Sequence, residues 1–211
     1  MRRAPRSVPS RKPQAAAASP RAWQRMLSGR RLDLLDPSPM DVEIEDIAHG
    51  LARVARWNGQ TTGAQIFSVA QHSLLVEAIA ARLGGALSRA ERLTVLLHDA
   101  PEYVVGDLIS PFKAVLGGDY RNVEARLLGA IHLRFSLPAV APAWLSAQCK
   151  AADKVAAYLE ATRVAGFSLA EADAVFGRPD CDLSGLDAHF APLSADDAKA
   201  AFLARFHALD H

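Results

Sequence analysis

Four side chains of metal-binding types occur at positions where a plain helical core would hold apolar residues. His72 lies on the apolar stripe of a predicted helix, His98-Asp99 ends an apolar run, and Asp153 lies among small apolar neighbours. Taken singly, each is also explained as a hydrogen-bonded buried polar group. Together, two imidazoles and two carboxylates suit one divalent ion such as Mn²⁺, Fe²⁺, Co²⁺, Ni²⁺ or Zn²⁺ and leave positions for water or substrate. The residues therefore predict a metal site, with the identity of the ion, Mg²⁺ included, left open.

Helices must position these side chains, because most of the chain has apolar residues at helical spacing. Ser-x-x-Gln/Glu/Asp capping boxes at Ser68, Ser88 and Ser194 mark three helix starts, and Pro101 disfavours helix just after His98-Asp99. Helical spacing runs on from residue 22, and helices are expected between 40 and 56 and at about 69–83, 89–99, 119–135, 143–165 and 195–208. No segment alternates convincingly at period two. The predicted fold class is all-α, a compact multi-helix bundle.

Composition excludes several classes of protein. The 211 residues are 50% hydrophobic and carry 24 Lys plus Arg against 23 Asp plus Glu, so no global field attracts a nucleic acid polymer or an anionic membrane. No stretch is long and apolar enough to span a membrane. The two cysteines, Cys149 and Cys181, form no disulfide framework or metal knuckle and favour a reducing compartment, so a cytoplasmic location is expected.

Two regions are expected outside the helical framework. Residues 1–20 carry five cations and no acid among scattered prolines, which predicts a disordered basic tail; a transit peptide is the alternative. Residues 21–211 are expected to form a single domain. Within it, the segment 178–193 is rich in turn residues and is expected to run over the surface before the last helix.

The string His72, His98-Asp99, Asp153 resembles the H…HD…D signature of the HD-domain phosphohydrolases, a helical metal-dependent superfamily. The context narrows the resemblance: the chain has ARW at 55–57, SVAQHS around His72, HDAPEYVVGDLISPFK at 98–113 and AADKVAAYLEA around Asp153. These segments are similar to the R-W, S-x-x-x-H-S, H-D-x-x-E, G-D-L-x-[ST]-P-x-K and A-D motifs of bacterial 5′-deoxynucleotidases. The resemblance covers roughly residues 40–165.

The resemblance implies the same four metal ligands that the spacing predicts. It also implies that Glu102 exchanges a proton with water or the leaving oxygen, and that Asp107 is a second essential acid that orients sugar or water. Without the resemblance, Glu102 is equally a glutamate of a first helical turn. The five remaining histidines have no spacing that completes a site and are expected to be structural or solvated.

Substrate contacts are expected from three residues. Arg56 and Lys113 offer a guanidinium fork and a point charge for a phosphate dianion, although Arg56 can also be an ordinary solvated arginine. Trp57, beside Arg56, is implied by the resemblance to bound the sugar pocket. The Gly- and Thr-rich loop 58–67 departs from the family pattern, which leaves base preference open.

Other branches of the superfamily do not fit. A cyclic-dinucleotide phosphodiesterase would have HDIGK where this chain has HDAPE, a guanosine tetraphosphate hydrolase would have an acid in place of Tyr103, and a large dGTP triphosphohydrolase would have His in place of Glu102. The expected activity is removal of the 5′-phosphate from (deoxy)nucleoside monophosphates, by an enzyme that the resemblance implies to be a homodimer. Two alternatives remain: a nucleoside triphosphate triphosphohydrolase, and a non-catalytic nucleotide-binding helical protein.

Overall fold

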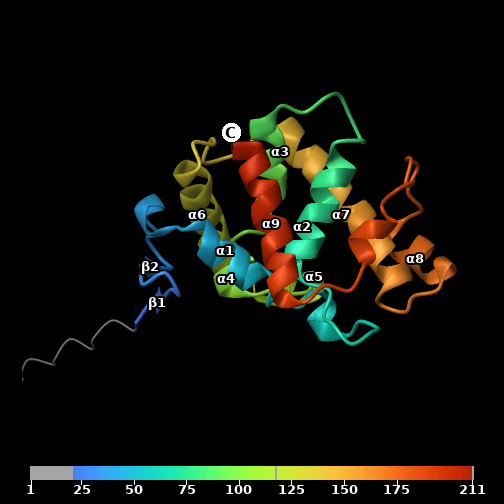
Figure 1. Ribbon diagram of the computed structural model, residues 1–211, viewed down its shortest axis with the longest axis horizontal. Coiled ribbons are helices and arrows are strands. Elements are labelled where there is room, and N and C mark those ends of the chain that lie inside the picture. The colour runs from blue at the N-terminus through green and yellow to red at the C-terminus, as the bar shows by residue number, and fades with distance from the viewer. Residues whose placement is uncertain (1–20, 117, 211) are drawn as a thin grey trace, which may run out of the picture.

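The computed structural model describes residues 21–116 and 118–210, and the fold of this part of the chain is all-α, as predicted (Figure 1). The expected tail at 1–20 lies outside the described residues. The helices are, in chain order, α1 (Ile44–Leu51), α2 (Val69–Ala80), α3 (Arg89–Leu96), α4 (Glu102–Val105), α5 (Ser110–Leu116), α6 (Gly118–Arg134), α7 (Ala143–Arg163), α8 (Leu169–Phe176) and α9 (Ala195–Asp210). Three short 3-10 turns accompany them: η1 (Pro39–Asp41), η2 (Arg56–Gly59) and η3 (Asp187–Phe190).

Local sequence signals account for the helix starts. Ser68 and Ser88 form complete capping boxes at α2 and α3, and the Ser194 hydroxyl accepts a hydrogen bond from the Asp197 amide at 3.1 Å at the start of α9. Ser168 forms a fourth box that starts α8, a helix that the spacing analysis did not predict. The other predicted helices are present, with ends that differ by a few residues, except that α1 is much shorter than the interval 40–56.

The expectation of helical spacing from residue 22 onward is wrong at its beginning. Residues 23–33 form an antiparallel hairpin of β1 (Trp23–Arg25) and β2 (Arg31–Asp33), with Trp23 opposite Asp33. Gly29 takes a positive φ of 96° in the turn, and Leu32 is fully buried from β2. A hairpin with three-residue strands is too short to show a period of two, which explains why the pattern missed it. The turn-rich segment 178–193 runs over the surface as predicted, with most of its residues exposed, and it contains the short turn η3.

The central element of the fold is α2, which packs against α7, α3 and α9 (Figure 1). It is buried nearly all round, and ten of its twelve residues are buried. Two apolar clusters meet along it, one built mainly from α1, α3 and α9 and the other from α2, α7 and α8. A polar residue on α2 therefore lies in the interior of the molecule and needs a partner there.

Glu77, at the far end of α2 from the predicted site, has such partners. Its buried carboxylate accepts hydrogen bonds from Arg92 of α3 and, at 2.9 Å, from both Nε and Nη2 of Arg205 of α9. One carboxylate thus ties three helices together.

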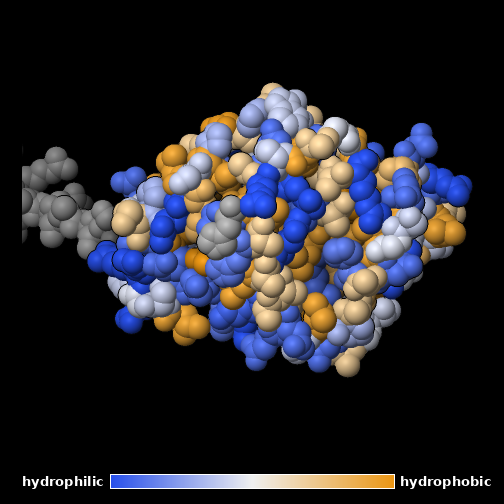
Figure 2. All heavy atoms as spheres, turned by 45° about the horizontal axis from the view of Figure 1, so that its top comes forward, coloured by the Kyte–Doolittle hydropathy of each residue, from blue (hydrophilic) through white to orange (hydrophobic). Residues whose placement is uncertain are grey.

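Polar and apolar residues are interspersed over the face seen in Figure 2. Within the described ranges, no helix has the length and apolar character needed to cross a bilayer.

Candidate active site

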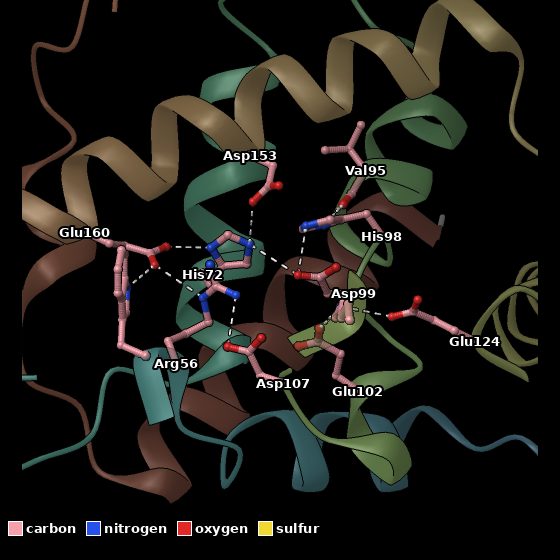
Figure 3. A network of polar contacts seen from close by, with 12 residues as sticks. Arg56, His72, Val95, His98, Asp99, Glu102, Asp107, Glu124, Asp153 and Glu160 are labelled. Atoms are coloured by element: carbon pink, nitrogen blue, oxygen red, sulfur yellow. Dashed lines mark hydrogen bonds and ion pairs between the residues drawn. The ribbon is translucent and has the colours of Figure 1, made fainter. Parts of the chain in front are cut away.

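The four predicted metal ligands come together around the ring of His72 (Figure 3). His72 comes from α2, His98 and Asp99 from the turn after α3, and Asp153 from the middle of α7. The Nε2 atom of His72 lies 3.3 Å from a carboxylate oxygen of Asp99 and 3.3 Å from one of Asp153, and Nε2 of His98 lies 3.2 Å from Asp99. One ligand atom each of His72, His98 and Asp153 lies within 4.8 Å of the others, so these three side chains could hold one ion.

Both imidazole rings are oriented by hydrogen bonds from the nitrogen that faces away from the cluster. The Nδ1 atom of His98 donates to the Val95 carbonyl at 2.9 Å, and Nδ1 of His72 donates to Glu160 at 2.5 Å. A carbonyl or carboxylate oxygen accepts, so Nδ1 carries the proton and Nε2 keeps its lone pair when the ring is neutral. The two lone pairs then face the same point.

The Nε2 atoms of His72 and His98, which face the cluster, are better suited to binding a metal ion than to hydrogen bonding with the surrounding residues. Neither Nε2 atom has a hydrogen-bond partner among the described residues, although both are buried, because their contacts with the carboxylates lack hydrogen-bond geometry. Two unpartnered imidazole nitrogens beside two carboxylates are the donor set of a divalent ion with open positions. The residues present therefore fit the expected cofactor.

The electrostatics of the cluster also favour a cation. Burial and the nearby Arg56 favour a neutral His72 ring, yet the carboxylates of Glu160, Asp153 and Asp99 raise the pKa of His72 well above its usual value. Burial disfavours the charged forms of Asp99 and Asp153, but the two histidines hold the pKa of both carboxyls below the ordinary range. A divalent ion bound at this point would supply positive charge next to these carboxylates.

The site opens to solvent on the side of its carboxylates. The His72 side chain has no exposed surface, whereas 22% of the Asp99 side chain and 44% of the Asp153 side chain are exposed. A substrate would approach from this side.

Arg56 reaches the cluster because of an unusual turn. The chain before it pairs with the start of α2 through a bridge between Ala55 and Ser68, and the Arg56 amide donates to the Phe67 carbonyl at 2.8 Å. Trp57, Asn58 and Gly59 then take left-handed φ angles of 57°, 51° and 73°. This conformation costs energy for residues other than glycine and is often found at functional sites.

The Arg56 guanidinium is held by two carboxylates. Its Nη1 contacts Asp107 at 3.0 Å and its Nε contacts Glu160 at 3.3 Å. Burial disfavours its charge, but Glu160 and Asp107 outweigh that effect and raise the pKa of Arg56, so the side chain stays cationic. Asp107 follows Gly106, whose φ of 77° lets the chain turn back toward Arg56.

Glu160 is a residue of the site that the sequence analysis missed. Its fully buried carboxylate accepts hydrogen bonds from His72, from the Trp57 indole N–H at 2.9 Å and from Arg56. It lies seven residues after Asp153 on α7, which places both on one face of the helix. That spacing was the available signal.

Glu102 occupies the buried side of the site at the start of α4. Its Oε1 accepts from Lys113 at 3.1 Å, while its Oε2 is buried without a partner in the described part of the chain. Burial and the charges of Asp99 and Asp107 raise the pKa of Glu102 to about 9. The carboxyl is therefore protonated at neutral pH in the metal-free protein.

Lys113, predicted to contact phosphate, bridges two carboxylates. Its Nζ lies 3.1 Å from Glu102 and 3.1 Å from Glu124 of α6. The ammonium is next to the cluster, and Glu124 is a second partner that sequence reasoning did not find.

Trp57 lies on the far side of Glu160 from the metal ligands. Its ring centroid is 5.6 Å from that of Phe167 and 6.0 Å from that of Phe176. With its indole N–H bonded to Glu160, the side chain is fixed at both ends, although it begins the glycine-rich loop.

A protein of Rhodobacter capsulatus is 60% identical to this chain over 190 residues, which cover 90% of the chain and 96% of the relative. The chain belongs to the family of that protein. The relative is described as uncharacterized, so the kinship by itself brings no activity to this chain. No protein-family model matches the sequence.

The arrangement joins three kinds of chemistry in one site. His72, His98 and Asp153 could hold a metal ion, Arg56 and Lys113 provide fixed positive charge, and Glu102 offers a proton in a water-poor position. A metal ion, cations and an acid around one opening are suited to hydrolysis of a phosphate ester.

Proposed function

We propose that this protein is a divalent-metal-dependent phosphohydrolase that removes the 5′-phosphate of (deoxy)nucleoside monophosphates. The observation that carries the proposal is the convergence of two unpartnered imidazole nitrogens with the carboxylates of Asp99 and Asp153. The nucleotide part of the proposal rests on the resemblance of the HDAPEYVVGDLISPFK and SVAQHS segments to 5′-deoxynucleotidases.

His72, His98, Asp99 and Asp153 would hold the ion. A bound divalent ion supplies Lewis acidity to a phosphoryl oxygen and lowers the pKa of a water molecule, which provides the nucleophile near neutral pH.

The other residues bind the ester and move the proton. Arg56, kept cationic by Asp107 and Glu160, binds the equatorial phosphoryl oxygens, and Lys113 leaves Glu124 to join it. Glu102 is buried next to the cluster, and as a carboxylic acid it would donate its proton to the leaving 5′-oxygen. The resemblance assigns Trp57, whose indole N–H is bonded to Glu160, to the boundary of the sugar pocket.

The test is a screen of the purified full chain with Mn²⁺, Co²⁺, Ni²⁺, Zn²⁺ and Mg²⁺ against nucleoside mono- and triphosphates. Orthophosphate release from deoxyadenylate that disappears with a chelator and returns with one of these ions is the expected result. Arg56→Gln should weaken the reaction with metal still bound. Arg53→Gln, which removes an exposed arginine paired with Asp196, is the matched control and should leave the rate unchanged.

Each alternative gives a different result in the same screen. Release of triphosphate from nucleoside triphosphates, with no orthophosphate from monophosphates, would replace the proposal with a triphosphohydrolase. Nucleotide binding with no product under any metal would identify a non-catalytic binding protein.

A further inference from the structure

We propose that Glu160 is a positioning residue that orients the metal ligand His72 with one carboxylate oxygen and the phosphate-binding Arg56 with the other. The inference rests on the metal site of the proposed function. It adds that one carboxylate holds both a metal ligand and the phosphate-binding arginine in place. Glu160 belongs to α7, and its carboxylate faces α2 and the left-handed turn at η2 (Figure 3). None of its side chain is exposed.

The first oxygen acts on the metal ligand. Oε1 accepts the Nδ1 proton of His72 at 2.5 Å, which fixes the ring orientation and leaves Nε2 as the only nitrogen free to bind an ion. A carboxylate in this position also makes the imidazole a stronger donor to the metal. Removing such a partner typically costs 10- to 100-fold in metal affinity.

The second oxygen holds Arg56, the residue proposed to bind phosphate. Oε2 accepts from Nε of Arg56 at 3.3 Å and from the Trp57 indole at 2.9 Å. Since Asp107 engages Nη1, the two carboxylates fix the guanidinium plane and leave Nη2 for the substrate. Arg56 and His72 therefore take their positions from the same group.

An amide cannot replace this carboxylate. All three neighbours of Glu160 are donors, and a glutamine has only one acceptor oxygen. Whichever way the amide is turned, its NH₂ group faces a donor, either the His72 ring or the Arg56–Trp57 pair. Glu160→Gln therefore keeps the size of the side chain but breaks one of its two connections.

The experiment compares Zn²⁺ dissociation constants, measured by chelator competition, of the full-length wild type, Glu160→Gln and Glu160→Ala. We expect the variants to bind 10- to 100-fold more weakly, with the alanine variant the weaker of the two. Glu77→Gln is the matched control, because it removes a buried carboxylate from α2 that contacts arginines away from the site, and its Zn²⁺ affinity should equal that of the wild type.

A second measurement separates positioning from general loosening. In the Zn²⁺-loaded, ¹⁵N-histidine-labelled protein, we expect a downfield Nδ1–H signal of His72 that is missing in His72→Ala. It should shift or broaden in both Glu160 variants and remain in Glu77→Gln. With Zn²⁺ saturating, inorganic phosphate should also bind more weakly to Glu160→Ala than to the wild type. If the alanine variant does not fold by circular dichroism, the glutamine variant carries the test.

The outcomes separate the two claims. Equal Zn²⁺ affinity, an unchanged His72 signal and equal phosphate affinity in folded Glu160→Gln would overturn the role of Glu160 and leave the metal site intact, because the amide must break one of the two connections. A wild type that binds no divalent ion would overturn both.

Discussion

Glu102 is the residue whose surroundings conflict most with its ordinary charge. It is almost fully buried, its Oε2 has no partner among the residues described, and Asp99 and Asp107 add negative charge nearby. Lys113 offsets only part of this effect. A carboxyl kept protonated at neutral pH costs folding stability and is of use to a reaction that needs an acid.

Replacing Glu102 with glutamine should slow turnover and leave metal binding intact. The amide keeps the shape of the side chain but cannot give up a proton, so we expect kcat to fall by about 10²–10⁴-fold. Steady-state kinetics and metal analysis check this result. Glu124→Gln, at the other partner of Lys113, is the control and should change kcat far less. Wild-type turnover in Glu102→Gln would show that the residue is only a helix-start glutamate.

The same substitution should stabilise the metal-free protein. Glu102 titrates near 4.5 in the unfolded chain and near 9 in the folded one, so folding takes up a proton between these values and the wild type loses stability as pH rises through this window. The gain from Glu102→Gln should be small at pH 5 and up to about 3 kcal/mol at pH 7. Urea unfolding with chelator at both pH values measures it, and a gain that does not grow with pH would contradict the raised pKa.

Residue types and spacing were enough to predict that His72, His98, Asp99 and Asp153 come together, because His98-Asp99 and Asp153 lie where apolar residues belong in an amphipathic pattern. Glu160 was not found for a physical reason. A glutamate in a helix is ordinary by type, and only its three donors, which come from other elements of the chain, make it part of the site. Lys113 was found, but its contact with Glu124 depends on how α5 meets α6.

At the scale of elements, Glu102 is placed by the packing of α4 on α1. Gly50 of α1 allows this contact, because a Cβ atom at this position would lie 2.7 Å from Cβ and 2.9 Å from the carbonyl oxygen of Tyr103. A side chain here would push away the helix that begins at Glu102.

Gly50→Ala should therefore lower stability by about 1–3 kcal/mol and reduce activity as well. Gly129→Ala is a matched control in α6, where the added Cβ would make only an ordinary contact, 3.6 Å from the Ala139 carbonyl. There the better helix propensity of alanine should leave stability equal or slightly higher. Thermal unfolding and initial rates compare the two variants; equal effects would show that close packing at Gly50 is unimportant.

The elements themselves were predictable where the local chemistry is decisive. Ser68 and Ser88 form capping boxes with residues three positions later in the sequence, so the free backbone N–H groups at these helix starts find local partners. Their helices could therefore be predicted. The hairpin at 23–33 depends on contacts far along the chain: the Ser28 amide and hydroxyl donate to Asp46, and Leu32 is buried against the core. Such contacts leave no periodic pattern in a short segment.

At the scale of the whole molecule, the candidate metal ligands connect α2, the turn after α3 and the middle of α7. An ion at this point would cross-link three segments, the first and last of which are 81 residues apart in the sequence (153 − 72), and would join the helices that line both apolar clusters. Metal binding should therefore stabilise the whole fold as well as the site.

A divalent ion at about 100 times its dissociation constant should add about 2.7 kcal/mol of stability and raise the Tm by about 5–10 °C. His72→Ala should remove this increase. His132→Ala is the matched control, because His132 is a buried histidine bonded to the Pro138 carbonyl, and its Tm should still rise with metal. Calorimetry with and without the ion measures the effect. An equal rise of the Tm in His72→Ala would show that the ion binds at a different site.

The left-handed backbone at 57–59 restricts which amino acids can occupy position 58, although the side chain there is exposed. Consecutive side chains diverge by about 100° in a helix and about 180° in a strand, so Arg56 and Trp57 can share the Glu160 carboxylate only because the backbone reverses its hand after Arg56. In a saturation library scored for activity, position 58 should accept asparagine, aspartate and glycine and reject valine, isoleucine and threonine. The tolerance of an exposed loop position would then be set by backbone handedness rather than by any side chain that it touches.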